Sequence, residues 1–330
     1  IFSIDYKGSV PEYKYFLDTV SKKEYKEYCE RYKGKLWILR RELFLYCKTD
    51  CIALHQIMVK FQKQIHSLLK IDITKYPTLS SIAFSGFRAN FMKKDQIPKI
   101  LSKLHYTLKQ SYFGGITEVY KGKGFNINSY DVNSLYPFAM LNNPMPVGQP
   151  THFSGDISLI NKDAFGFFKV KVSAPLDLNK PTLPLRLETE NGIRTVFPVG
   201  TWTCWYFSEE IKDKIKDGYK FEVLEGFLFE KSYIFNEYIN LLYEIKCSRD
   251  SSDSLYYIAK LLMNALYGRF GLNPEARECV IVTQEESEKL VFEQRNAIAI
   301  PLLSGKVLVS YDQNQEDINI SDISIPISSA

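Results

Sequence analysis

The sequence predicts a protein of the mixed α/β class, in which long helices flank an insertion with its own small sheet. Three observations support this prediction: helical apolar spacing over residues 36–69, short apolar-polar alternations over residues 150–232, and renewed helical spacing over residues 233–271. The length of 330 residues suggests two or three domains.

Helices dominate the elements expected in the first third of the chain. Residues 22–34 are highly charged and end at Gly34, which favours a helix stop. The long apolar pattern of residues 36–69 predicts a second helix, and Pro77 closes this region. Residues 80–94 predict a short helix, after which a loop is expected.

Strands and helices are expected to alternate in the remaining two thirds. Residues 125–137 predict a strand that runs into a turn, and a short helix is expected at residues 138–142. An acidic loop is expected at residues 312–322. The other predicted elements are strands at 164–174, 194–208 and 219–231, helices at 209–218, 233–249 and 255–271, and strands over most of the residues that follow.

Composition excludes few function classes. The net charge of +4, from 42 basic and 38 acidic residues, is too balanced to establish nucleic-acid binding. The aromatic content of 14% fits either a surface that stacks on bases or a tyrosine-rich core. The 6 cysteines and 4 histidines show no zinc-ligand spacing, so free thiols in a reducing compartment are expected. No apolar run approaches the roughly 18 residues of a membrane span, and the first residues resemble neither a signal peptide nor a transit peptide.

The stretch NSYDVNSLYPFAM at residues 128–140 concentrates functional side chains. Asp131 at the end of the predicted strand would present a carboxylate at the sheet edge, where a hard cation such as Mg²⁺ can bind. The next residues enter a turn and a helix, so backbone N–H groups near Ser134, Leu135 and Tyr136 can face an anion. The ring of Tyr136 would lie beside a sugar. These groups together indicate a nucleoside triphosphate site, and the alternative is an aspartate that only caps the helix.

A second motif, KLLMNALYGRFG, places three functional side chains on one helical face. Lys260, Asn264 and Tyr267 are spaced i, i+4 and i+7. The lysine can neutralise a triphosphate, the asparagine can hydrogen-bond a base or sugar, and Tyr267 with Gly268 lets a flat base pair lie against the helix end. The alternative is an ordinary amphipathic helix with a glycine stop.

Two shorter motifs precede these. In YFGG, the glycines Gly114 and Gly115 after Tyr112 permit close backbone approach to a ligand, although such a pair is also found in flexible loops. In YCKTD, Tyr46 and Asp50 are four residues apart on the predicted long helix. This pattern is loose and often occurs by chance.

The four motifs resemble those of family B DNA polymerases. DVNSLYP matches motif A, DxxSLYP, and KLLMNALYG is similar to motif B, KxxxNSxYG, except that Ala265 replaces the serine. YFGG resembles the YxGG signature between exonuclease and polymerase domains, and YCKTD resembles the third exonuclease motif, YxxxD. The order of the motifs and the insertion between motifs A and B most resemble the protein-primed DNA polymerases of bacteriophages and of fungal and plant mitochondrial linear plasmids.

This resemblance implies DNA-directed DNA synthesis with two Mg²⁺ ions, a DNA template-primer, deoxynucleoside triphosphates and a terminal protein as primer. It also implies a monomer without membrane association and a mitochondrial location. In the polymerase site, the resemblance implies metal binding by Asp131 and Val132, phosphate contact by Ser134 and Leu135, exclusion of a 2′-hydroxyl by Tyr136, and triphosphate neutralisation by Lys246 and Lys260. Asn264 and Tyr267 would inspect the nascent base pair, and Tyr112, Gly114, Gly115 and Gly268 would contact DNA. In the exonuclease, Asp50 would bind metal and Tyr46 would orient the attacking water.

The resemblance also implies a domain order. The expected segments are the end of a ribonuclease-H-like 3′–5′ exonuclease domain at 1–75, a linker ending in YxGG at 76–115, a palm with motif A at 116–150, a terminal-protein-region insertion at 151–232, helical fingers with motif B at 233–275, and the start of a second insertion or palm at 276–330.

The set of motifs is incomplete. No two aspartates are separated by one residue, so the DTD of motif C is absent, and the first two exonuclease motifs are absent as well. Two-metal phosphoryl transfer requires at least two carboxylates. The chain is therefore interpreted as an internal fragment of a polymerase, and the alternative is a catalytically inactive remnant that at most binds DNA or terminal protein.

Overall fold

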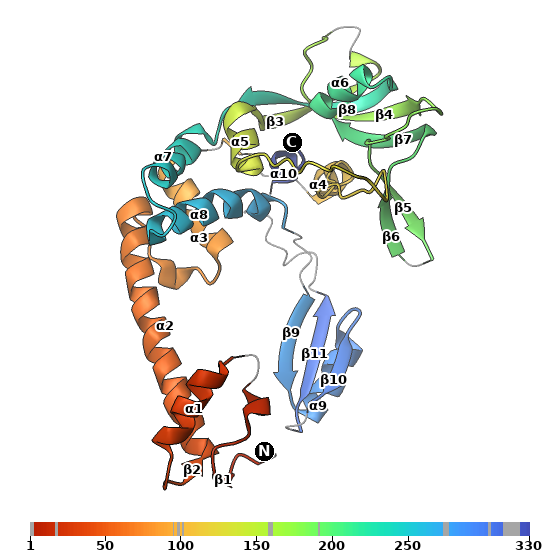
Figure 1. Cartoon of the computed structure of the whole chain (residues 1–330). Helices are drawn as coiled ribbons and strands as arrows, with labels where there is room; N and C mark the ends of the chain where they lie inside the picture. The colour runs from red at the N-terminus through yellow and green to blue at the C-terminus, as the bar shows by residue number, and fades with distance from the viewer. Residues whose placement is uncertain are drawn as a thin grey trace. The chain divides into compact units, whose positions relative to one another are not determined.

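The computed structural model describes residues 3–16, 19–94, 96, 97, 100, 102–157, 161–190, 192–272, 277–302, 305–312 and 324–330. The chain forms two compact units, Ile1–Thr74 and Lys75–Ala330. Helices and antiparallel sheets both occur, which confirms the predicted mixed α/β class (Figure 1).

The first unit is mainly helical. Ser21 and Glu24 cap its first helix reciprocally, because each side chain accepts a hydrogen bond from the backbone N–H of the other residue. The long helix exposes apolar side chains along most of its length, and its buried residues are Ile65 and Leu69 near its end. The elements of this unit are β1 (Lys7–Gly8), η1 (Tyr13–Tyr15), α1 (Lys22–Arg31), β2 (Trp37–Ile38) and α2 (Leu39–Leu69), with η2 (Ile73–Lys75) at its boundary.

A helical group in the second unit contains the helices expected from the sequence. Helix α8 lies against α3 and α7 and buries one apolar face there (Figure 1). Two phenylalanine rings of α3 contact the ring of Phe270. Helix α5 packs against both α7 and α8. The members of this group are α3 (Leu79–Asn90), α5 (Leu135–Asn142), α7 (Asn236–Cys247) and α8 (Ser254–Phe270).

An antiparallel sheet of order β3-β8-β4-β7 forms the core of the predicted insertion. Alternate residues of β4 point to opposite faces. Phe168, Val170 and Val172 pack in the cluster that includes Ile211 of α6, whereas Phe167 packs in the opposite cluster with residues of α4 and α10. The elements around this sheet are β3 (Met145–Ser154), β4 (Gly166–Ala174), β7 (Gly200–Phe207), β8 (Lys220–Ser232), α6 (Ser208–Lys216), α4 (Ser102–Lys109), α10 (Ile325–Ser329) and the hairpin β5 (Leu185–Thr189) and β6 (Gly192–Val196).

A second small sheet follows α8. Its order is β10-β11-β9, and α9 packs against β11. The elements are β9 (Arg277–Val282), α9 (Gln284–Glu293), β10 (Ile298–Pro301) and β11 (Val307–Asp312). The acidic loop predicted at 312–322 falls, apart from its first residue, outside the described residues.

Three expectations about local structure were wrong. Residues 125–134 are irregular rather than a strand, because they pair with no strand in the described part of the chain. Helix α4 forms where a loop was expected, and α9 forms where strands were expected. Thr283 caps α9 by accepting a hydrogen bond from the Glu286 N–H at 3.3 Å, a local signal that the strand prediction overlooked.

Candidate functional site

The motif A segment ends in a helix whose first turn is exposed. Ser134 immediately precedes α5 in a left-handed conformation, with φ of 55°, and its carbonyl accepts the N–H of Phe138 at 2.9 Å. Leu135 and Tyr136 in the first turn are 55% and 51% exposed. The first backbone N–H groups of a helix have no partner within the helix, so this end of α5 can attract an anion.

Lys246 reaches this helix start from α7. Its Nζ donates a hydrogen bond to Ser134 Oγ at 2.9 Å. The same ammonium group lies 5.8 Å from the ring centre of Tyr243, one turn earlier on α7. A cation therefore stands directly beside the N-terminus of α5, although 112 residues separate Lys246 from Ser134.

Tyr136 and Tyr267 join the two main motifs. Their ring centres are 5.3 Å apart with an interplanar angle of 34°. The Tyr267 hydroxyl donates to the carbonyl of Ser328 on α10, and burial, together with the nearby hydroxyls of Tyr112 and Tyr136, raises the pKa of Tyr267. Tyr267 thus stays neutral and is held from α10 while its ring faces motif A.

The face of α8 next to Tyr267 is open. Lys260, Asn264 and Gly268 are exposed, and no atom outside the helix lies within 4 Å of the place that a Cβ would take on Gly268. The buried side of the same helix includes Leu262 and Leu266. The spacing prediction is confirmed in this respect, since the polar motif B residues are on the exposed side and the apolar residues form the core.

The tyrosine of YFGG lies against the end of α8. A Cβ on Gly271 would be 2.8 Å from the Tyr112 hydroxyl and 3.2 Å from Ser328 Cβ. Gly271 therefore permits this close approach, a role that the sequence analysis did not assign. Its only sequence signal is its position as a glycine after a helix. Gly114 and Gly115 are exposed, with open space around both.

The predicted metal-binding residues do not form a complete set of ligands. Asp131 and Val132 are exposed in the irregular segment before α5, and in the described residues Asp131 forms no ion pair. Within the same residues no three His, Cys, Asp or Glu side chains converge into a metal-binding group. The Asp131 carboxylate and Val132 carbonyl fit Mg²⁺ in ligand chemistry, but they supply only part of the roughly six oxygens that this ion requires.

The residues of YCKTD belong to the first unit. Tyr46 and Asp50 lie one turn apart on α2, and Tyr46 is 69% exposed. Both residues line a cavity of about 710 Å³. The remaining lining residues are Pro11, Tyr15, Phe16, Tyr28, Arg31, Trp37, Leu39, Glu42, Leu43, Leu45 and Thr49.

Comparison with known proteins gives one family. Residues 2–330 match the family described as DNA polymerase type B, organellar and viral. A probable DNA polymerase of Neurospora intermedia is 49% identical over 99% of this chain and 35% of its own length. A probable DNA polymerase of Ascobolus immersus is 45% identical over 99% of this chain and 27% of its own length. This chain therefore spans about a third or less of these relatives.

A solved structure shares the fold. The Phi29 DNA polymerase complexed with primer-template DNA and incoming nucleotide substrates matches with a TM-score of 0.54 and 18% sequence identity. The match covers 76% of this chain and 44% of that one. This likeness supports the predicted fold alone.

Proposed function

Since this chain belongs to the organellar and viral type B DNA polymerases, we propose that it is part of a DNA-directed DNA polymerase that adds deoxynucleoside triphosphates to a primer on a DNA template. The single observation that carries this proposal is the convergence of motif A with α7 and α8. Lys246 contacts Ser134, and Tyr136 contacts Tyr267. A helix N-terminus, a cation and two rings suit the phosphates and the sugar and base of a nucleotide.

The chain's residues then act mainly by binding and positioning. Leu135 and Ser134 would face the triphosphate, and the ring of Tyr136 would exclude a nucleotide that carries a 2′-hydroxyl. Lys246 and Lys260 would neutralise phosphate charge while the primer 3′-hydroxyl attacks the α-phosphate, which forms the new phosphodiester bond, breaks the bond to the β-phosphate and releases pyrophosphate. The complementary strand and incoming base would lie on the exposed face of α8.

The other motif residues have roles in the same proposal. Asn264 and Tyr267 inspect the nascent pair, and Tyr112, Gly114, Gly115 and Gly268 contact the DNA. Asp131 and the Val132 carbonyl would hold Mg²⁺, and the bound ions would supply stabilisation of the charge on the transferring phosphate. The remaining ligands would come from elsewhere in the polymerase.

The more specific parts of the proposed function rest on the resemblance to protein-primed DNA polymerases. We propose a terminal protein as primer, a linear plasmid-like DNA in mitochondria as template, and a 3′–5′ exonuclease in which Asp50 holds metal and Tyr46 orients water. We also propose that the protein acts as a monomer. In the part of the chain that the structure describes, no helix combines the length and apolarity needed to cross a membrane.

The second candidate function is that of a catalytically inactive remnant that at most binds DNA or terminal protein. One observation favours it, namely that the described residues contain no group of three or more His, Cys, Asp or Glu side chains that could hold a metal ion. Binding of primer-template DNA without extension would distinguish this candidate from an active polymerase.

The test is primer extension by the longest open reading frame that contains this chain, with Mg²⁺ and all four deoxynucleoside triphosphates. Asp131→Asn should lower the extension rate by about 10³-fold, because loss of a metal ligand removes several kcal/mol of transition-state stabilisation. Asp163→Asn, an exposed change in the insertion, is the control and should leave the rate unchanged. Extension by Asp131→Asn at the normal rate would refute the assigned role.

A further inference from the structure

The segment from Tyr112 to Tyr120 is attached at its first end to the insertion. Arg186 on β5 donates a hydrogen bond from Nη2 to the Tyr112 carbonyl and another from Nη1 to the Lys109 carbonyl at 3.4 Å. One guanidinium group therefore bridges two carbonyls at the end of α4.

The same guanidinium group also holds the next residue. Its carbon lies 5.3 Å from the ring centre of Phe113, which in turn stacks on Tyr206 with 5.9 Å between ring centres and an angle of 22°. Tyr206 is fully buried, and its hydroxyl donates to the Pro184 carbonyl at 2.6 Å. Arg186 and Phe113 are therefore supported by the rigid core of the insertion.

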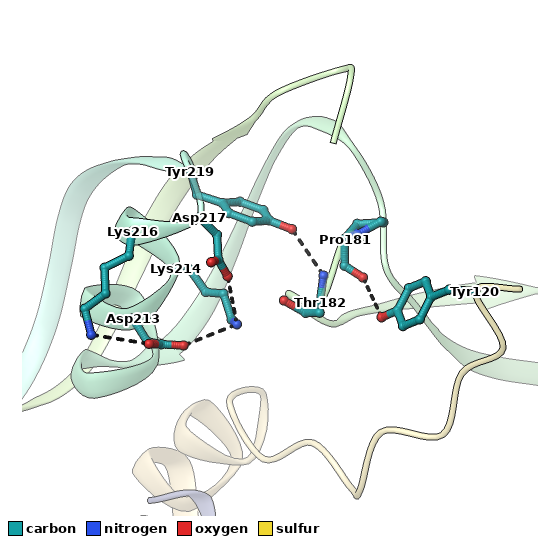
Figure 2. A network of polar contacts seen from close by, with 8 residues as sticks. All are labelled: Tyr120, Pro181, Thr182, Asp213, Lys214, Lys216, Asp217 and Tyr219. Atoms are coloured by element: carbon teal, nitrogen blue, oxygen red, sulfur yellow. Dashed lines mark hydrogen bonds and ion pairs between the residues drawn. The ribbon is translucent and has the colours of Figure 1, made fainter. Parts of the chain in front are cut away.

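The second end of the segment is attached to the same stretch of the insertion. The Tyr120 hydroxyl donates to the Pro181 carbonyl at 3.1 Å, as Figure 2 shows. The neighbouring Thr182 N–H donates to the hydroxyl of Tyr219 at 3.3 Å, and the Tyr219 side chain is buried. Residues 181–186 thus hold both ends of the segment.

The part between these two attachments is open. Gly114 and Gly115 have no atom within 4 Å of the place where a Cβ would stand. Their backbone is therefore accessible while both flanks are fixed, which lowers the entropy lost when a ligand binds.

We propose that residues 181–186 of the insertion form a clamp that positions the YFGG segment for primer-template DNA. In this clamp Arg186 and Tyr120 are positioning residues, which act on DNA through the backbone of Gly114 and Gly115. The inference rests on the proposed function, because that function assigns DNA contact to these glycines. It adds that DNA binding at YFGG depends on the insertion.

The clamp requires an arginine. A lysine keeps the positive charge but lacks the planar fork that contacts two carbonyls and stacks on Phe113. Arg186→Lys should therefore behave like Arg186→Ala rather than like the wild-type protein. Arg194→Ala is a matched control, because Arg194 is exposed on the paired strand β6 and its loss removes the same charge.

The first measurement is limited chymotrypsin digestion, with cleavage after Phe113 and Tyr120 followed by mass spectrometry. Loss of a charged hydrogen-bond donor should accelerate this cleavage at least roughly fivefold in Arg186→Ala and Arg186→Lys. Tyr120→Phe should accelerate cleavage after Phe113 to a smaller extent, and Arg194→Ala should match the wild type. The melting temperature should change little, because the sheet core is untouched.

The second measurement is the affinity for a primer-template duplex at fixed salt concentration. Arg186→Ala and Arg186→Lys should weaken binding roughly fivefold to tenfold, clearly more than Arg194→Ala. Normal binding by Arg186→Lys, or unchanged cleavage in both Arg186 variants, would overturn the clamp. If the wild-type protein binds no primer-template, the proposed function fails, and the clamp is then judged by the cleavage rates alone.

Discussion

At the scale of single residues, the hydrogen bond between Lys246 and Ser134 is the most informative contact of the site. It brings a cation to the N-terminus of α5, where Nζ donates to a hydroxyl at 2.9 Å. A hydroxyl neutralises no charge, so the ammonium group retains its attraction for an anion. This arrangement favours a phosphate ligand over a purely structural role.

Lys246→Ala should therefore raise the KM for deoxynucleoside triphosphates about tenfold, because the variant loses one phosphate contact. A tenfold change corresponds to about 1.4 kcal/mol of binding free energy. Steady-state primer extension would measure it. Ser134→Ala leaves the charge in place and should change KM less than about threefold. Lys216→Ala, on the exposed side of α6, serves as the control for general loss of charge. A KM unchanged in Lys246→Ala would contradict the role in triphosphate binding.

At the scale of elements, the sequence predicted best the helices and strands whose formation depends on the residues within them. The spacing of Lys260, Asn264 and Tyr267 predicted the helix correctly, and Lys260 and Asn264 lie on its exposed side, since helical periodicity is a local property. The predicted strand at 125–137 failed because a strand needs a hydrogen-bonded neighbour, and the described strands provide none for it.

The contacts that assemble the site could not be predicted in the same way. Lys246 to Ser134, Tyr136 to Tyr267 and Tyr112 to Gly271 each join segments distant in sequence. Spacing within one motif contains no information on which distant motif it will meet. Resemblance to a family supplied the roles of these residues, but the contacts themselves required the structure.

The sheet of the insertion offers a stability prediction at this scale. A Cβ on Gly226 of β8 would stand 2.7 Å from the Phe167 carbonyl oxygen and 2.7 Å from the Phe153 ring. Gly226→Ala should lower the free energy of unfolding by about 1–3 kcal/mol through overpacking. Denaturant unfolding would measure the change. Gly122→Ala, at a site with open space, should change it by less than about 0.5 kcal/mol, and an equal loss in both variants would refute the explanation.

At the scale of the whole molecule, stability should depend on pH through Glu210 on α6. Burial raises the pKa of this carboxyl from 4.5 to about 7, Lys214 lowers it, and Asp213 raises it. Glu210 also lines a cavity of about 610 Å³ beside Gly114 and Lys231. The folded state thus binds a proton that the unfolded state releases above pH 4.5.

A raised pKa in the folded state stabilises the protein at low pH, and this contribution is lost as the pH rises through about 7. Glu210→Gln removes the titration, so its advantage in free energy of unfolding over the wild type should grow from pH 5 to pH 8 and reach at most about 3 kcal/mol. Denaturant unfolding at both pH values would measure this difference. Glu209→Gln, at an exposed neighbour, should show no such growth. A pH-independent difference between Glu210→Gln and the wild type would show that the carboxyl titrates alike in both states, and burial would then not control its pKa.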